Sequence, residues 1–395
     1  MGWCTPVAES ESAAQAVAQS VAASAAEFHR LRVSEVNAET ADAVSLTLRV
    51  PPELAARYAY RPGQFLTLRI PTADGSALAR CYSLSSSPHP VNPGADLTVT
   101  VKRVAEGRGS NWLCDHIEVG AELDTMAPAG TFTPRSLDAD LLLVAAGSGI
   151  TPVMSILRAA LAAGSGRLVL LYANRDERSV IFADELSELA AAYPARLVVL
   201  HWLESLQGLP GRAALAALVG PHAEREVFLC GPAPFMDATT HALRDLGVPR
   251  SRLHIERFVS LTEDPFAGLA DPSTESAAAA AGPTSADESR DRSDGSTAED
   301  SSAADSSVEV QLDGERHTFR WPAGTVLLDL LRERGLDAPF SCREGACSAC
   351  ACRITAGEVK MRRNEVLDQT DLDEGYVLAC QALPITESVS VSYDE

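Results

Sequence analysis

The sequence predicts a multidomain protein with a doubly wound α/β domain in its middle and a small α+β domain at its end. The chain has 395 residues, more than one domain of about 150 residues requires. Residues 271–307 contain no aromatic residue and no Leu, Ile or Val, so they cannot bury a core and are expected to form a flexible linker. Before this segment, apolar strand patterns alternate with helical patterns, which is typical of a parallel sheet.

The composition excludes several classes of protein. There are 54 acidic and 33 basic residues, giving a net charge of −21, and such a chain repels nucleic-acid phosphates. No apolar run approaches the roughly 18 residues that cross a bilayer, so we expect no membrane span. Residues 1–27 lack the basic segment of a secretory signal. A cytoplasmic location is therefore expected, where clustered cysteines indicate a metal site or catalysis.

The first pattern that suits cofactor binding follows an alternating strand at 64–70. Arg80, Tyr82 and Ser83 come next. On a strand, Arg80 and Tyr82 share one face, which suits a phosphate and an isoalloxazine ring, while Ser83 faces the other way unless the strand bends or ends. A half-exposed strand followed by a serine-rich turn is an equal alternative.

The second pattern comes after a strand at 97–104. Gly107, Gly109 and Ser110 open a helix, and the amides of a helix N-terminus can hold a pyrophosphate. Taken alone, a capped helix without a ligand is the favoured interpretation.

The third pattern is the most informative. An apolar strand at 141–146 leads into Gly147-Ser148-Gly149-Ile150-Thr151-Pro152 and a helix at 153–163, which forms a phosphate cradle. Pro152 stands where the full dinucleotide motif has its third glycine. Strands at 167–175, 196–204 and 226–230 and a helix at 182–193 complete a doubly wound sheet.

The cysteines near the end form a ligand pattern. Cys342-x4-Cys347-x2-Cys350, with Cys380 further on, has the plant-type [2Fe–2S] spacing. Small residues between these cysteines let the backbone approach a cluster. Zinc is the competing metal, but structural zinc modules usually pair two CxxC motifs, and one is present here. Cys352 is expected to be a buried core thiol. A hairpin at 308–321 and a helix at 325–335 ending at Gly335 surround the pattern.

In combination, these motifs resemble known families. RxYSLS, GxGSNWL, GSGITP and CGPxxFM lie in the order and spacing of the ferredoxin–NADP reductase superfamily over residues 28–262, and 308–395 resembles plant-type ferredoxins. This domain order is similar to reductase components of multicomponent oxygenases, above all those of 3-ketosteroid 9α-hydroxylase and phenylacetyl-CoA epoxidase. SNWLCD, YANRDERSVIF, HWLESLQG and HIERF favour the ketosteroid type.

The resemblance implies the domain organisation. The expected segments are a disordered tail at 1–27, an antiparallel FAD-binding β-barrel at 28–135, an NAD(P)-binding α/β domain at 136–262, a flexible acidic linker at 263–307 and a β-grasp [2Fe–2S] ferredoxin domain at 308–395. The linker is longer and more acidic than is usual in this family.

The resemblance also implies roles for individual residues. The flavin contacts are Arg80, Tyr82, Ser83, Lys102 on the adenosine side, and Gly107, Gly109 and Ser110 at the pyrophosphate. The nucleotide contacts are Gly149 and Thr151, with Cys230 against the nicotinamide and Glu256 and Phe258 beside the flavin. Ser83, Cys230 and Glu256 are the expected catalytic residues, and Cys342, Cys347, Cys350 and Cys380 are the cluster ligands. FMN occurs in one branch with this domain order, and FAD is favoured here.

The choice between NADH and NADPH is a question of charge. A 2′-phosphate requires Arg or Lys, whereas a free ribose tolerates an acid. The strand at 196–204 ends in Glu204-Ser205, with no Arg before Arg212, so NADH is favoured. Arg175 and Arg178 would weaken this prediction if they reached the ribose.

The resemblance implies an NADH-dependent oxidoreductase that passes electrons through FAD and a [2Fe–2S] cluster to a partner oxygenase, a Rieske-type steroid hydroxylase. The alternatives are the reductase of phenylacetyl-CoA epoxidase or of another oxygenase, and an electron-carrier module whose reductase half is inactive. The presence of Arg80, Ser83, Gly149 and Cys230 argues against the inactive form.

Overall fold

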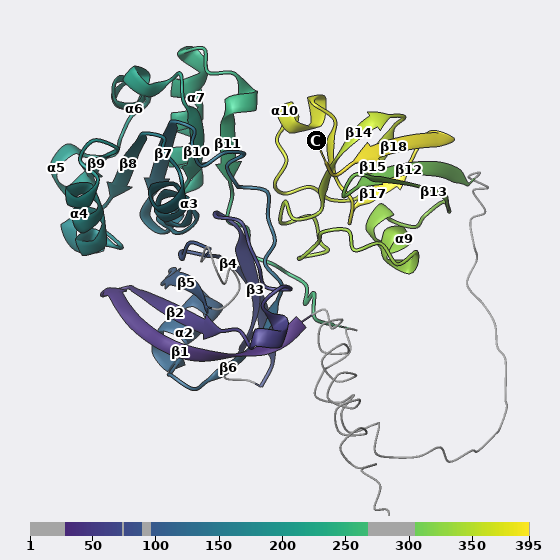
Figure 1. Ribbon diagram of the computed structural model, residues 1–395, viewed down its shortest axis with the longest axis horizontal. Helices are drawn as coiled ribbons and strands as arrows, with labels where there is room; N and C mark the ends of the chain where they lie inside the picture. Colours follow the sequence, from purple (N-terminus) through teal and green to yellow (C-terminus); the bar gives the residue numbers. More distant parts are fainter. Residues whose placement is uncertain (1–27, 73–74, 89–95, 268–304, 395) are drawn as a thin grey trace, which may run out of the picture. The chain divides into compact units, whose positions relative to one another are not determined.

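The computed structural model describes residues 28–72, 75–88, 96–267 and 305–394. They belong to two compact units (Figure 1). The first contains the described residues up to 267 together with 339–349, and the second contains residues 305–338 and 350–394. The predicted tail and residues 268–304 of the predicted linker lie outside the described residues. The domain boundaries drawn from the sequence therefore stay predictions. Throughout the described ranges, every helix is too short or too polar to traverse a bilayer.

The first unit begins with a six-stranded antiparallel sheet in the order β4-β3-β6-β1-β2-β5 (Figure 1). Its strands are β1 (Phe28–Thr40), β2 (Ala43–Arg49), β3 (Phe65–Pro71), β4 (Ala77–Ser83), β5 (Asp96–Lys102) and β6 (Glu122–Met126), and helix α2 (Arg108–His116) follows β5. An antiparallel bridge between Leu84 and Val99 joins the chain after β4 to β5. The two edges of the sheet therefore meet, and the expected antiparallel barrel is confirmed.

The same unit continues into a five-stranded parallel sheet in the order β11-β10-β7-β8-β9. Its elements are β7 (Leu141–Ala146), α3 (Ile150–Ala163), β8 (Leu168–Asn174), α4 (Ala183–Ala192), β9 (Leu197–Leu203), α5 (Glu204–Gln207), α6 (Arg212–Val219), β10 (Glu226–Cys230), α7 (Ala233–Asp245) and β11 (Leu253–Glu256). All residues of the central strand β7 are buried, as a strand covered on both faces requires.

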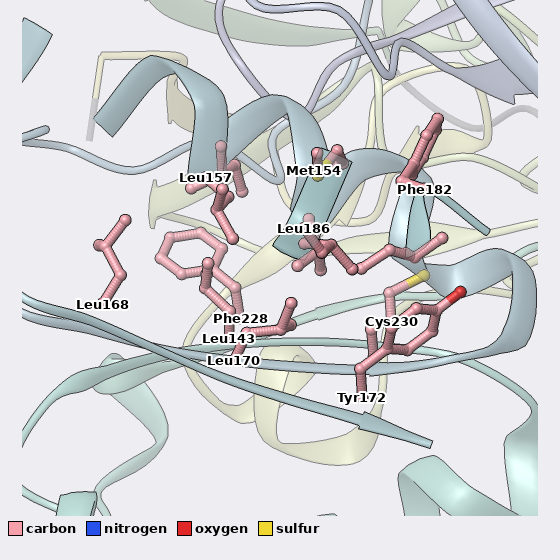
Figure 2. Close-up of a cluster of buried hydrophobic side chains, with 14 of the residues drawn as sticks. Leu143, Met154, Leu157, Leu168, Leu170, Tyr172, Phe182, Leu186, Phe228 and Cys230 are labelled. Atoms are coloured by element: carbon pink, nitrogen blue, oxygen red, sulfur yellow. The ribbon is translucent and has the colours of Figure 1, made fainter. Parts of the chain in front are cut away.

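Helices cover both faces of this parallel sheet. Leu143 of β7 packs in a cluster with Leu157 of α3 and Leu186 of α4 (Figure 2). The alternate residue Leu142 faces a second cluster that contains Leu215 of α6 and Leu243 of α7. Successive strand residues point to opposite faces, so the continuous apolar strands correctly predict a doubly wound domain.

The second unit has a mixed sheet in the order β13-β12-β18-β14-β16 and a small sheet of β15 and β17. Its elements are β12 (Ser306–Leu312), β13 (Glu315–Trp321), α9 (Leu327–Glu333), β14 (Ala351–Ala356), β15 (Val359–Met361), α10 (Gln369–Asp373), β16 (Tyr376–Leu378), β17 (Ala382–Pro384) and β18 (Ser388–Ser392). Asp313 and Gly314, both with positive φ, make the two-residue turn that suits a hairpin. The predicted hairpin, helix and α+β class are confirmed.

Candidate active site

The end of β4 lies against the beginning of α2. A Cβ atom added to Gly109 would stand 3.3 Å from Cγ of Arg80 and 3.6 Å from the hydroxyl of Tyr82. The two side chains therefore share a face of the strand and reach the helix N-terminus, as the i, i+2 spacing predicts. Ser83 is the last residue of β4 and is buried. The structure brings Arg80, Tyr82 and Gly109 together.

The N-terminus of α2 is built around glycine. Gly107 is the N-cap residue and supplies no side-chain cap. A Cβ at this position would lie 2.5 Å from Oγ of Ser110, whose hydroxyl accepts a hydrogen bond of 3.3 Å from the amide of Val104. The amides of a helix's first turn have no intrahelical acceptor. The Arg80 stem lies against this turn, and its guanidinium donates to the carbonyls of Ala79 and Leu261. The free amides at this helix N-terminus fit the pyrophosphate of FAD.

The turn at the start of α3 packs directly on the end of β10. A Cβ at Gly149 would lie 2.2 Å from the carbonyl oxygen of Cys230, so only glycine fits. Gly147 has a φ of 53°, and the Thr151 hydroxyl donates to the Ser148 carbonyl at 3.1 Å. The structure therefore brings Gly149, Thr151 and Cys230 together at the carboxyl edge of the parallel sheet, where nucleotides bind in such folds.

Cys230 and Glu256 are register partners at the ends of β10 and β11. Burial raises the pKa of Glu256 to about 8, so the carboxyl group holds a proton at neutral pH. Burial, followed by the influence of Glu256, raises the pKa of the Cys230 thiol. Burial raises the pKa of the Cys81 thiol, and Cys342 and then Glu256 raise it further. The parallel sheet therefore ends in a partly buried acid beside the Cys230 thiol.

Lys102 faces the nucleotide turn. Its Nζ lies 3.8 Å from a carboxylate oxygen of Asp42 and would be 4.0 Å from a Cβ added to Gly147. Burial lowers the pKa of this lysine. Its expected contact with the adenosine side of the flavin stays a prediction. Phe258, which follows β11, is 49% exposed, and its predicted place beside the flavin also stays a prediction.

The carboxyl ends of β8 and β9 are joined by a hydrogen bond of 2.8 Å from the amide of Ser205 to the carbonyl of Arg175. The Arg175 guanidinium forms an ion pair of 2.9 Å with Asp42. Glu204 begins α5 at the same edge. The end that would meet the adenosine ribose therefore presents an acid, and Arg175 is engaged by another acid.

The predicted cluster ligands are all buried, with Cys342, Cys347, Cys350 and Cys380 between 1% and 7% exposed. In the first unit, the amide of Ala346 donates to Sγ of Cys342 at 3.4 Å, the type of contact a cluster thiolate accepts. In the second unit, the amide of Ala379 donates to the carbonyl of Cys350 at 3.1 Å. Within the described ranges, no three Cys, His, Asp or Glu residues form a group that could hold a metal ion. The ligand assignment therefore stays a prediction that depends on spacing and burial.

Sequence reasoning missed Ser155 and Arg158 of α3. Both contact the chain just after β4: the Ser155 hydroxyl donates to the Ser86 carbonyl, and Arg158 to the Ser85 carbonyl. The signal available was a Ser and an Arg three residues apart in a helix whose remaining residues from 150 to 163 are almost all apolar. Polar residues at this spacing share one helix face.

Two protein families match parts of the chain. The oxidoreductase NAD-binding domain family matches residues 143–241, and the 2Fe-2S iron-sulfur cluster binding domain family matches residues 310–384. The second match includes all four predicted ligands and favours iron–sulfur over zinc.

Relatives match over nearly the whole chain. The 3-ketosteroid-9-alpha-monooxygenase ferredoxin reductase component of Mycobacterium tuberculosis is 53% identical over 92% of this chain and 96% of its own. One subunit of the 1,2-phenylacetyl-CoA epoxidase of Escherichia coli is 34% identical over 93% of this chain and 98% of its own. The solved structure of phthalate dioxygenase reductase, 21% identical, matches with a TM-score of 0.50 over 92% of this chain and 98% of that one, which supports the fold. The chain belongs to the oxidoreductase family of oxygenase reductase components that join an NAD-binding domain to a C-terminal [2Fe–2S] domain, the family of the 3-ketosteroid-9-alpha-monooxygenase reductases.

Proposed function

We propose that this protein oxidises NADH and delivers the electrons, through FAD and a [2Fe–2S] cluster, to the oxygenase component of a steroid-hydroxylating system. The observation that carries the proposal is the packing of the Gly149 turn on Cys230. Cys230 is in register with Glu256. Helix α3, which begins at this turn, donates hydrogen bonds to the Ser85 and Ser86 carbonyls just after the barrel strand β4. These contacts support a flavin site and a nucleotide site that adjoin each other between the barrel and the parallel sheet.

The protein's own residues would bind the two cofactors and orient them toward each other. The α2 amides and Arg80 would hold the flavin pyrophosphate, and the α3 turn would hold the nucleotide pyrophosphate. Flavin chemistry, when FAD is bound, accepts a hydride and releases electrons singly. In the balanced reaction, NADH becomes NAD⁺, one proton is released, and two electrons leave one at a time through the cluster. Glu256 keeps a neutral carboxyl beside the reacting groups and so avoids adding a buried negative charge there.

NADH is favoured over NADPH by charge. Glu204 would repel a 2′-phosphate, and the guanidinium of Arg175 is already paired with Asp42. A ribose hydroxyl can instead donate a hydrogen bond to a carboxylate. We therefore expect NADPH to support the reaction much less well than NADH.

Sequence identity supports the choice of oxygenase. The relatives that are 50–53% identical are ketosteroid monooxygenase reductase components, whereas the phenylacetyl-CoA epoxidase subunit is 34% identical. A cytoplasmic location is part of the proposal, because NADH and reduced thiols are both available there.

The test is anaerobic reduction of the purified full-length protein. We expect stoichiometric FAD, two irons per chain, and bleaching of both chromophores by NADH without other proteins. Turnover is then measured with a ketosteroid oxygenase and a phenylacetyl-CoA epoxidase in parallel, using NADH and NADPH. Cluster absorption that NADH leaves unbleached would instead support a carrier with an inactive reductase half. Coupling to the epoxidase alone would overturn the steroid assignment.

A further inference from the structure

We propose that Arg158 is a positioning residue that fixes the flavin-bearing strand β4 relative to the nucleotide turn. This inference rests on the proposed function, since it concerns the distance between the two cofactor sites. It assigns a role to two polar residues of α3, Ser155 and Arg158, whose helix begins at the nucleotide turn.

The two residues bind consecutive carbonyl groups of the segment that follows β4. The Ser155 hydroxyl donates to the Ser86 carbonyl at 2.6 Å and accepts from the amide of Gly63 at 3.3 Å. Arg158, one turn further along α3, donates to the Ser85 carbonyl. Ser155 is fully buried, where an unpaired polar group would cost about 1–3 kcal/mol.

Arg158 is held in its orientation by α4. Its Nε donates to a carboxylate oxygen of Glu185 at 2.7 Å, and a second nitrogen contacts the other oxygen. The guanidinium also lies 5.0 Å from the centre of the Phe182 ring, and the side chain is 21% exposed. The planar guanidinium of arginine can bind a carboxylate with two of its nitrogens and a carbonyl with the third, whereas the single ammonium group of lysine cannot.

The segment that these residues hold is itself fixed to the barrel. The amides of Ser85 and Ser86 donate to the Thr98 carbonyl, at 2.8 and 3.4 Å. The Ser86 hydroxyl lies 2.8 Å from that of Tyr60. Ser85 is two residues beyond Ser83, the predicted flavin contact. Helix α3 therefore joins the nucleotide turn at its first residues to the end of the flavin strand at its middle.

A matched control residue lies beside the other end of the same helix. Arg196 donates to the carbonyls of Ala160, Leu161 and Gly166 and lies 5.9 Å from the Tyr193 ring centre. Its guanidinium, like that of Arg158, binds backbone carbonyls and faces an aromatic ring, but all these contacts are within the nucleotide domain. R196K should therefore disturb α3 without disturbing the segment after β4.

The experiment compares wild type, R158K and R196K as full-length proteins with their cofactors. Hydrogen exchange of the Ser85 and Ser86 amides should accelerate about tenfold in R158K, which corresponds to about 1.4 kcal/mol, and stay at the wild-type rate in R196K. In anaerobic stopped flow, the rate constant of flavin reduction by NADH should fall about tenfold or more in R158K, since small misplacements are costly. The NADH dissociation constant should stay within about twofold of wild type.

The outcomes separate this inference from the proposed function. If NADH fails to reduce wild type, the proposed function is wrong. If wild type is reduced and R158K matches R196K in both exchange and reduction rate, the positioning role is wrong. Should R158K fail to fold, S155A is measured in its place, because it keeps Arg158 and removes the Ser155 bonds to the Ser86 carbonyl and the Gly63 amide. Unchanged exchange at Ser86 would then refute the proposal.

Discussion

Replacing Gly149 by alanine tests how tightly the nucleotide turn packs on the parallel sheet. The backbone at Gly149 has a φ of −62° and a ψ of −8°, which alanine adopts without strain. The obstacle is space, since the new Cβ would lie 2.2 Å from the carbonyl oxygen of Cys230 and 2.6 Å from the amide nitrogen of Gly231. The turn and β10 must separate by about 1 Å to restore ordinary contact.

The expected cost is that of overpacking a core. Such insertions destabilise by about 1–3 kcal/mol, and the loss of glycine's freedom in the unfolded chain returns about 0.4–1 kcal/mol. Each kcal/mol shifts the Tm of a domain of this size by about 2–4 °C. The net cost is therefore at most about 2.6 kcal/mol, and we expect a decrease of up to roughly 10 °C in the transition of the first unit, together with weaker NADH binding.

Gly220 supplies the matched control. Its backbone is also helical, with a φ of −53° and a ψ of −47°, but an added Cβ would meet only Leu246 at 3.8 Å. G220A should therefore be neutral or stabilising by up to about 1 kcal/mol. The assay is thermal unfolding followed by far-UV circular dichroism, with flavin release marking the first unit. A G149A transition equal to or above that of G220A would refute the packing argument.

Two further predictions concern the acid and the cysteines. The pKa of Glu256 rises from 4.5 unfolded to about 8 folded, so wild-type stability should decline as the pH rises through this window and then level off. E256Q should lack that decline, and at pH 9 its free energy of unfolding should exceed that of wild type by roughly 1–3 kcal/mol, after allowance for partial exposure. If the two proteins showed the same pH dependence of stability, the raised pKa of Glu256 would be contradicted. C380S should lose the cluster's visible absorption and its iron, whereas C352A, whose thiol is also buried, should retain both. Loss of iron from C352A would show that the ligand set is wrong.

The sequence predicted the features that depend on neighbouring residues. The apolar strand at 141–146 and the glycines after it specify a strand, turn and helix within one short stretch, and β7 and α3 occupy it. The turn at Asp313-Gly314 likewise follows from two residues that tolerate positive φ. The four-cysteine spacing predicted the cluster family because a single loop must supply three of the ligands.

Other features depend on residues that the fold brings together from distant positions. Arg158 and Ser85 are 73 residues apart, and Arg175 and Asp42 are 133 apart, so no local pattern pairs them. The sequence raised Arg175 as a candidate for the 2′-phosphate because it follows a strand. The structure supplies the competing partner, Asp42 in the turn between β1 and β2, which only the docking of the barrel on the parallel sheet brings within reach.

Gly149 shows how a single residue type can satisfy two constraints. The sequence explains this glycine by the close approach of a phosphate, while the structure explains it by contact with the Cys230 carbonyl. The second reason holds without any ligand, so the stability loss in G149A should be measurable in the absence of NADH. It also means that the nucleotide turn cannot shift independently of Cys230. With Arg158 holding the segment after β4, the turn, the Cys230 thiol and the end of β4 form one packed arrangement. Under the proposed function, this packing would set the distance between the two cofactors before either is bound.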